Sequence, residues 1–408
     1  MSTHLTELEK PATASRPGPR LYWLKATIFL ASFALSAAAF LAFDFAYTSA
    51  LQRSSRSTGI LNTCRISDPT RHHALKANCF SMDRWGNNSF PFYTNSLAFR
   101  DSRIREIPLA ADRPRILILG NSFTEGEIAW DDSYVGKIAA HFPQYDILNG
   151  GLGLYSPSNY LNVARKVLAD GVEIDEVIVF LDTGNVADEA SFYRDINSSG
   201  AVAGPVRSHW KKWWYAKVRY FVAKHLLLTN DIFEFVERQL VAHGYYHLTV
   251  TVLAANVFDF EGPAWTYRKV NETDPYPSGY APLGVEGGLA KEKAKMDLLW
   301  EELHQRRIPL TVVVYPYPGQ VVHDTADSRQ VRIWRQWCQD KCKRFISVFP
   351  AFLAAKEQCP RSEPGCWYLD NFVFGDFHYS AAGNALIAGV VMDSLAQDPP
   401  TNMDAKAK

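Results

Sequence analysis

Short apolar runs alternate with longer amphipathic stretches along much of the chain. The runs 115–119, 177–181 and 310–315 are apolar at nearly every position, and each stops at glycine, proline or a polar residue. Runs of this length and composition are typical of parallel strands that are buried on both faces. A shorter run, 145–148, ends at Asn149 and predicts one more strand. The chain is therefore expected to form a mainly parallel sheet.

The stretches between and after these runs carry apolar residues at helical spacing. Alternating strands and helices with short connections place helices on both faces of a parallel sheet. The predicted fold class is α/β, as a three-layer α/β/α sandwich. We expect its helices over residues 133–141, 160–169, 289–305, 328–345 and 381–396.

The longest apolar run lies near the N-terminus and predicts a membrane anchor. Residues 26–43 carry no charge, and at about 1.5 Å per residue these 18 residues and their flanks can cross a hydrocarbon core of about 30 Å. Four basic residues precede the run and favour a cytoplasmic tail. We predict an uncleaved signal anchor at 22–44 in the inner (cytoplasmic) membrane, with the rest of the chain periplasmic or extracellular. Small residues at 37–39 leave a cleaved signal peptide as the alternative.

These patterns divide the chain into five parts with one insertion. The α/β pattern is interrupted between about residue 188 and residue 288. Inside this insertion, residues 210–241 predict a helix that mixes aromatic and basic side chains, and 254–288 predict a long loop. The five parts are a cytoplasmic tail at 1–21, the anchor at 22–44, an extracytoplasmic lead-in segment at 45–105, the α/β domain at 106–396 and a polar tail at 397–408.

Charge and cysteine content narrow the possible functions. The chain has 43 basic and 43 acidic residues, and its formal net charge is +0. It therefore has no excess of positive charge with which to bind a nucleic acid. The six cysteines form three close pairs along the chain, and in an oxidising compartment we expect disulfides 64–79, 338–342 and 359–366, although 15 connectivities are possible. No pair has the CxxC spacing of a metal site, and we predict neither a metal nor a cofactor.

Small and polar residues follow three of the predicted strands. These turns are 120–122, 149–151 and 182–185, and the segment 376–378 adds an Asp and a His near the C-terminus. In an open α/β sheet, ligands bind outside the carboxyl ends of the strands. We therefore expect the three turns to meet in one crevice.

The side chains in these turns suit acyl transfer. Ser122 is the candidate nucleophile, His378 the base that takes its proton, and Asp376 the acid that orients the imidazole. The tetrahedral intermediate needs fixed hydrogen-bond donors for its oxyanion, and the candidates are the N–H groups of Ser122 and Gly151 and the amide of Asn185. Each residue alone also suits a helix cap or a turn. Their order along the chain favours a common site.

Four blocks of this chain resemble those of the SGNH (GDSL-type) hydrolase superfamily. The match covers about residues 95–190 and 290–395, and its short blocks gain specificity from their order. Its departures are Asn121 in place of Asp, Val186 in place of Asp, and a single residue between Asp376 and His378. The close spacing leaves Asp370 or a backbone carbonyl as an alternative partner of the histidine. The blocks are Gly120–Gly126, Asn149–Pro157, Thr183–Asn185 and Asp376–Gly383, with a lead-in at Asn95–Asp101.

The resemblance implies an SGNH/flavodoxin-like fold and ester chemistry. It predicts a membrane-anchored serine esterase or O-acyltransferase that acts on acyl esters, mainly acetyl, of cell-surface or secreted polysaccharide through an acyl-Ser122 intermediate. The expected partners are the acylated polysaccharide and the machinery that synthesises it. Alternatives are a non-catalytic glycan-binding or assembly protein and a lipase or lysophospholipase. Aromatic residues in the insertion are candidates for stacking on sugars or for contact with the membrane surface: Trp210, Trp213, Trp214, Tyr215 and Tyr220.

Overall fold

The chain forms two compact units in the computed structural model. One unit consists of residues 1–57 and 221–232, and the other of residues 58–220 and 233–408. The structure describes residues 19–55, 62–85, 88–195, 202–203, 221–222, 224–245, 261–267 and 280–400.

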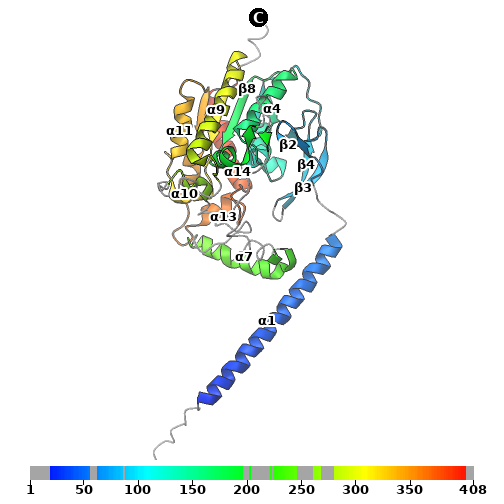
Figure 1. Ribbon diagram of the computed structural model, residues 1–408, viewed down its shortest axis with the longest axis vertical. Helices are drawn as coiled ribbons and strands as arrows, with labels where there is room; N and C mark the ends of the chain where they lie inside the picture. Colours follow the sequence, from blue (N-terminus) through cyan, green and yellow to red (C-terminus); the bar gives the residue numbers. More distant parts are fainter. Residues whose placement is uncertain are drawn as a thin grey trace, which may run out of the picture. The chain divides into compact units, whose positions relative to one another are not determined.

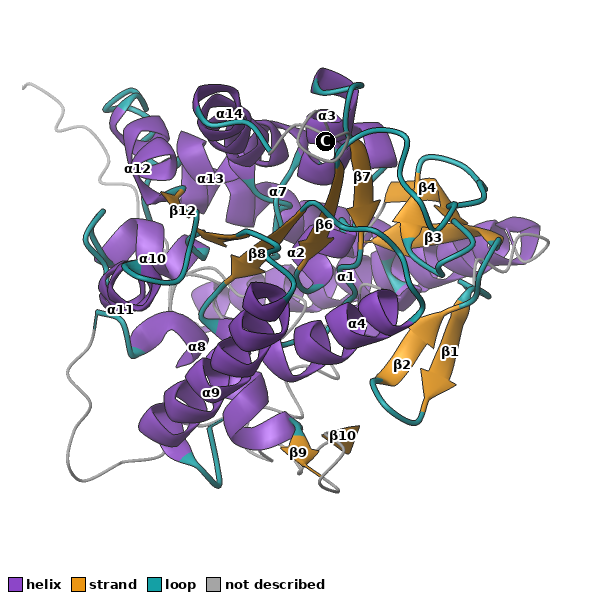
Figure 2. Cartoon of the chain, turned by 90° about the horizontal axis from the view of Figure 1, so that it is seen from above, coloured by secondary structure: helices purple, strands orange, loops and turns teal. Residues whose placement is uncertain are grey.

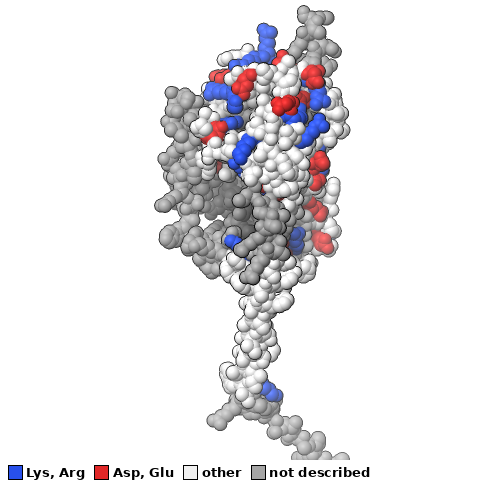
Figure 3. Space-filling view, turned by 90° about the vertical axis from the view of Figure 1, so that its right-hand side faces the viewer, with Lys and Arg blue, Asp and Glu red and all other residues white. Residues whose placement is uncertain are grey.

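The first unit is built on one long helix, α1 (Pro19–Ser55), which Figure 1 shows as uninterrupted. Its segment Trp23–Leu51 has a mean hydropathy of 2.1 and is long and apolar enough, by length and composition, to cross a membrane. On the face seen in Figure 3, this helix carries almost no Lys, Arg, Asp or Glu. The predicted anchor at 22–44 is therefore part of a longer helix.

Asp44 of α1 binds the N-terminus of helix α7 (Leu227–Ala242). The N–H groups of Leu228 and Thr229 donate to its carboxylate at 3.0 and 2.8 Å. A carboxylate in this place satisfies N–H groups that have no partner inside the helix and interacts favourably with the helix dipole. This contact explains how Asp44 is buried although it directly follows an apolar run.

The second unit contains a sheet of eight strands in the order β12-β11-β8-β6-β7-β5-β4-β3. Its first five strands are parallel, and numbered along the chain they have the spatial order 2-1-3-4-5 of a flavodoxin-like sheet. The other three are antiparallel. The parallel strands are β6 (Arg115–Leu119), β7 (Asp146–Asn149), β8 (Glu176–Leu181), β11 (Leu310–Val314) and β12 (Arg344–Ser347). The antiparallel strands are β3 (Phe80–Trp85), β4 (Asn88–Thr94) and β5 (Arg100–Asp101).

Alternating side chains of the parallel strands enter two separate cores. In β6, Leu117 and Leu119 belong to one core, and Ile116 and Ile118 belong to the other. Each fully buried Leu or Ile side chain contributes about 1.5–3 kcal/mol relative to an exposed one. The first core is covered by α4 (Pro157–Ala169), α9 (Gly284–Gln305) and α11 (Arg329–Cys338). The second is covered by α3 (Tyr134–His141), α10 (Pro318–His323), α12 (Phe349–Glu357), α13 (Cys366–Asn371) and α14 (Ala381–Gln397), so that helices lie on both faces (Figure 2).

The three-layer α/β arrangement confirms the predicted fold class, with one correction among its elements. The four predicted strands are β6, β7, β8 and β11, and the helices predicted at 133–141, 160–169, 289–305 and 381–396 are α3, α4, α9 and α14. The helix predicted at 328–345 ends at Cys338, and residues 344–347 form β12 instead. This edge strand has only four residues and only half of them are buried, so it lacks the apolar run that marked the other strands.

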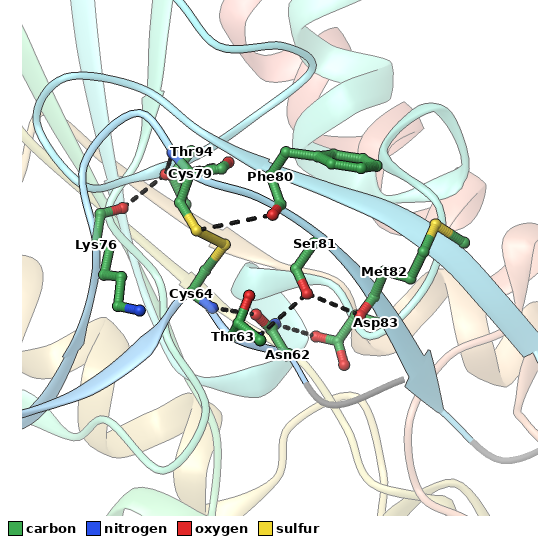
Figure 4. Close-up of a disulfide and its surroundings, with 10 residues drawn as sticks. All are labelled: Asn62, Thr63, Cys64, Lys76, Cys79, Phe80, Ser81, Met82, Asp83 and Thr94. Atoms are coloured by element: carbon green, nitrogen blue, oxygen red, sulfur yellow. Dashed lines mark hydrogen bonds between the residues drawn. A yellow bond between two sulfur atoms is a disulfide. The ribbon is translucent and has the colours of Figure 1, made fainter. Parts of the chain in front are cut away.

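The lead-in segment adds strands that its sequence did not indicate. β3, β4 and β5 extend the central sheet, and the hairpin of β1 (Arg65–Asp68) and β2 (His72–Leu75) forms a small sheet of its own. The disulfide Cys64–Cys79 joins the two parts, and near it the Thr94 hydroxyl donates to the Lys76 carbonyl at 2.6 Å (Figure 4). All three predicted cysteine pairs are disulfides in the structure.

About half of the predicted insertion lies outside the described residues. Its helix predicted at 210–241 corresponds, within the described part, to α7, whereas the aromatic residues between 210 and 220 lie outside that part. So do most of the loop predicted at 254–288 and the outer parts of both predicted tails. The short elements are α2 (Ser122–Glu125), η1 (Trp130–Asp132), α5 (Gly184–Ala187), η2 (Asp188–Phe192), β9 (Arg194–Asp195), β10 (Val202–Ala203) and α8 (Glu261–Ala264).

Candidate active site

Ser122 begins helix α2 at the carboxyl end of β6. The neighbours of β6, strands β7 and β8, lie on its two sides, so this strand end is the point where the chain order of the sheet reverses. The Asn121 side chain caps α2 by accepting from the N–H of Phe123 at 3.2 Å. A Cβ atom at Gly120 would lie only 1.8 Å from Thr124 Oγ1, so the tight turn needs glycine there. These local constraints present the Ser122 hydroxyl at the edge of the sheet.

The structure brings together the three side chains of the predicted triad. Ser122 Oγ lies 2.8 Å from His378 Nε2, and His378 Nδ1 lies 2.8 Å from Asp376 Oδ1. The N–H of Phe377 also donates to Asp376 Oδ1, at 2.6 Å. The backbone turns sharply here, with Gly375 at a φ of 78°, which lets an acid two residues before the histidine reach its ring. Asp370, the alternative acid, instead offers its backbone carbonyl to Ser380.

The two carboxylates beside His378 control its charge. Burial by itself lowers the pKa of His378, but Glu127 and Asp376 outweigh this effect and raise the pKa to about 9. Burial raises the pKa of Asp376, yet its attraction to His378 keeps the pKa below the ordinary value. Negative charge on these two groups therefore favours the protonated imidazole, and the neutral form, the one able to accept the Ser122 proton, increases as the pH rises.

Trp85, at the end of β3, is a site residue that the sequence did not reveal. Its indole Nε1–H donates to Asp376 Oδ2 at 2.9 Å, and its ring lies edge-on to the His378 ring with centroids 4.9 Å apart. The antiparallel part of the sheet thus reaches the acid of the triad. No pattern connects residues 291 positions apart in the chain, so only the fold could identify this contact.

Glu127 is a second residue that the sequence did not reveal. Its Oε2 lies 3.6 Å from His378 Nε2, and its side chain is 12% exposed. Burial is the main reason that the pKa of Glu127 rises to about 8. An acidic residue in the turn after the nucleophile block is a weak sequence signal, because turns commonly carry exposed acids.

Two of the three predicted oxyanion donors make hydrogen bonds within the protein. The Gly151 N–H donates to Asn149 Oδ1 at 3.0 Å, within the turn after β7. The Asn185 side chain is buried, and its Nδ2 donates to the Tyr155 carbonyl at 3.3 Å and the Tyr160 hydroxyl at 3.2 Å. Both groups are therefore occupied by the protein itself. The remaining predicted donor is the backbone N–H of Ser122.

A buried network joins the ends of three parallel strands beneath the site. Asn121 Nδ2 donates to Asp182 Oδ2 at 2.6 Å, and the Tyr315 hydroxyl donates to the same oxygen at 2.8 Å. Burial raises the pKa of Asp182 despite these hydrogen bonds. An Asp at position 121 would place a second carboxyl against Asp182. The amide of Asn121 thus fits its neighbour, which accounts for this departure from the usual motif.

The fold and the site together define an α/β protein with a hydrogen-bonded Ser–His–Asp arrangement at the carboxyl edge of its sheet. Among the described residues, no group of three or more His, Cys, Asp or Glu side chains is arranged to hold a metal ion.

No family model and no curated protein matches the chain. Solved structures similar to it include an α/β hydrolase from the metagenome of Lake Arreo, Spain, with 11% identity, 71% of this chain and 97% of that chain covered, and a TM-score of 0.35. A GDSL-like lipase from Bacteroides thetaiotaomicron has 10% identity, 71% and 92% coverage and a TM-score of 0.34. A member of the lipolytic GDSL family from Veillonella parvula has 11% identity, 69% and 98% coverage and a TM-score of 0.33. Likeness at these levels carries no functional inference.

Proposed function

We propose that the chain is an SGNH-type serine hydrolase that cleaves esters through an acyl-Ser122 intermediate. The observation that carries the proposal is the hydrogen-bonded series from Ser122 to His378 to Asp376. Ser122 Oγ attacks the ester carbonyl carbon while its proton passes to His378 Nε2. The imidazolium gives that proton to the leaving alcohol, and the acyl group stays on Ser122. A second nucleophile then releases the acyl group and restores the serine.

The test is ester turnover and active-site labelling of Ser122→Ala. The variant should show no hydrolysis of p-nitrophenyl acetate above background and no labelling by a fluorophosphonate. Ser102→Ala removes an exposed hydroxyl that is bonded to Asp101, and it should keep both activities. Turnover by Ser122→Ala at the wild-type rate would contradict the proposal. Absence of turnover by the wild type on every activated ester would favour the non-catalytic alternative.

For the substrate we propose an acyl group, mainly acetyl, on a polysaccharide outside the cytoplasm. Support comes from the long apolar helix α1, from three disulfides that suit an oxidising compartment, and from the resemblance of the sequence blocks. The tail before α1 would be cytoplasmic and the second unit periplasmic. Acetate release from an acetylated polysaccharide, compared between wild type and Ser122→Ala, tests the substrate. Protease protection in spheroplasts tests the orientation.

A lipid ester is a second candidate, favoured by helix α7. Its side chains Ile232, Phe235 and Val236 are 55%, 63% and 48% exposed and recur at helical spacing, as on a face that binds a lipid surface. A lipase should turn over long-chain esters faster than acetyl esters. A preference for acetyl esters would contradict this candidate.

A further inference from the structure

The Glu127 side chain lies close to His378 Nε2, the nitrogen that accepts the Ser122 proton. One of its two carboxylate oxygens makes no hydrogen bond to any described residue. Its Oε2 is completely buried, and among the described residues no group makes a hydrogen bond to it. A buried carboxylate oxygen without a hydrogen-bond donor is costly, so such a group calls for a role. It lies 3.6 Å from His378 Nε2, beyond hydrogen-bond length.

The distances around His378 Nε2 suit a small hydroxylic molecule. Two polar atoms 3.6 Å apart can both lie at ordinary hydrogen-bond length, about 2.8–3.0 Å, from one oxygen that sits to one side of the line joining them. Ser122 Oγ lies 2.8 Å from the same nitrogen, so that oxygen would also lie beside the acyl group carried by Ser122. A Cβ atom at Gly153 would lie 3.9 Å from Glu127 Oε1 and 3.8 Å from Ser122 Cβ, which shows that Glu127 and Ser122 approach the same backbone segment.

The turn that carries Glu127 is fixed from both sides. The buried Arg100 guanidinium donates to the carbonyls of Glu125 and Ile128, which flank Glu127 in the chain. Glu125 in turn accepts from the N–H of Gly153 at 2.7 Å. A carboxyl that is held in this way can orient a reactant without paying much conformational entropy during the reaction.

We propose that Glu127 positions the water molecule that releases the acyl group from Ser122. This inference rests on the proposed serine-hydrolase function. The water would donate one hydrogen to Oε2 of the ionised Glu127 and the other to Nε2 of the neutral His378. A water molecule offers two hydrogens and an alcohol only one, so the arrangement favours hydrolysis over transfer to a sugar.

The proposed step balances without any further reactant. The water oxygen forms a bond to the acyl carbon while one O–H bond breaks and its proton passes to Nε2. The tetrahedral intermediate then collapses, the bond from the acyl carbon to Ser122 Oγ breaks, and Nε2 returns the proton to Oγ. Glu127 has the same protonation state before and after the step.

The test separates acylation from deacylation in Glu127→Ala, with p-nitrophenyl acetate and rapid mixing. Above the pH midpoint of His378, where the imidazole is neutral in both proteins, we expect the first release of p-nitrophenol to keep its rate and the steady-state rate to fall by about 10²-fold. The acetylated protein should then accumulate and be visible by intact-mass spectrometry. Glu127→Gln keeps an acceptor oxygen, so its steady-state rate should lie between those of wild type and Glu127→Ala.

Two controls separate this inference from its alternatives. Asp131→Asn changes an exposed carboxyl four residues away, outside the turn that Arg100 holds, and it should not change the ratio of the two rates. If Glu127→Ala slows both steps equally, or neither, the inference is wrong. A burst that persists in Ser122→Ala would instead overturn the proposed function, because no acyl-Ser122 could form.

Discussion

The two parts of the central sheet contribute differently to the site. The parallel strands β6, β7, β8, β11 and β12, with their connections, provide the triad itself. The antiparallel strands β3, β4 and β5 provide groups that hold it: Trp85 bonds to the triad acid, and Arg100 fixes the turn that carries Glu127. The reacting groups thus lie in segments with a visible motif. Of the supporting groups, Arg100 lies in the lead-in block Asn95–Asp101, whereas Trp85 lies where the sequence shows no motif.

The largest expected effect comes from the triad acid in the parallel part. Asp376→Asn keeps the shape of the side chain but removes the charge that orients His378 and stabilises its protonated form. We expect kcat for p-nitrophenyl acetate to fall by about 10²–10⁴-fold. An unchanged thermal melting curve would show that the fold persists. A loss smaller than about tenfold would mean that another group orients the histidine.

Loss of the Cys64–Cys79 disulfide in the lead-in segment should change the unfolding free energy more than the catalytic rate. Replacing Cys64 and Cys79 by Ser opens a connection across 15 residues and should cost about 3 kcal/mol of unfolding free energy. Replacing Cys338 and Cys342, separated by 4 residues, should cost less, about 2 kcal/mol. Urea denaturation of both double variants measures the difference. A larger loss for the short connection would contradict the prediction.

The pH dependence tests the charges around His378, where Glu127, Asp376 and Asp182 act on the ring. Because its pKa is raised to about 9, kcat/KM should rise by roughly 50-fold between pH 7 and pH 9. In Glu127→Gln one negative charge is absent, so the midpoint should move to lower pH. A midpoint near the ordinary histidine value in the wild type would contradict this assignment.

The proton on His378 should affect activity and stability in opposite directions as the pH rises. The pKa of His378 is higher in the folded chain than its ordinary value of 6.5, so its stabilising contribution is complete below about pH 6.5 and is lost as the pH rises through about 9. The unfolding free energy should therefore fall over the range in which the rate rises. Denaturation of wild type and His378→Ala across this range measures the contribution.

The smallest expected effect comes from the antiparallel part. Trp85→Phe keeps the ring beside His378 but removes the hydrogen bond to Asp376 Oδ2. We expect kcat to fall about 3–10-fold, because the acid keeps its bonds to His378 and Phe377. Trp300→Phe, at a tryptophan whose Nε1 donates to the Lys341 carbonyl, is the matched control and should leave kcat unchanged. An unchanged kcat in Trp85→Phe would show that the hydrogen bond from Trp85 to Asp376 does not contribute to the rate.

Periodicity predicted the parallel strands and most of the helices because those segments bury whole faces. It failed for β12 and for β3 to β5, which are short or half exposed and so lack continuous apolar runs. The site shows the same limit. The sequence predicted the triad of Ser122, His378 and Asp376. It could not show that the Asn185 amide donates its hydrogen bonds to Tyr155 and Tyr160.

The sequence by itself determined the alternation of strands and helices, the long apolar helix near the N-terminus and the residues of the triad, because each of these follows from local pattern and spacing. Only the tertiary structure decided which side chains support the triad. Trp85 and Glu127 reach His378 and Asp376 through the pairing of distant strands and the packing of turns, and such contacts leave no regular spacing in the chain.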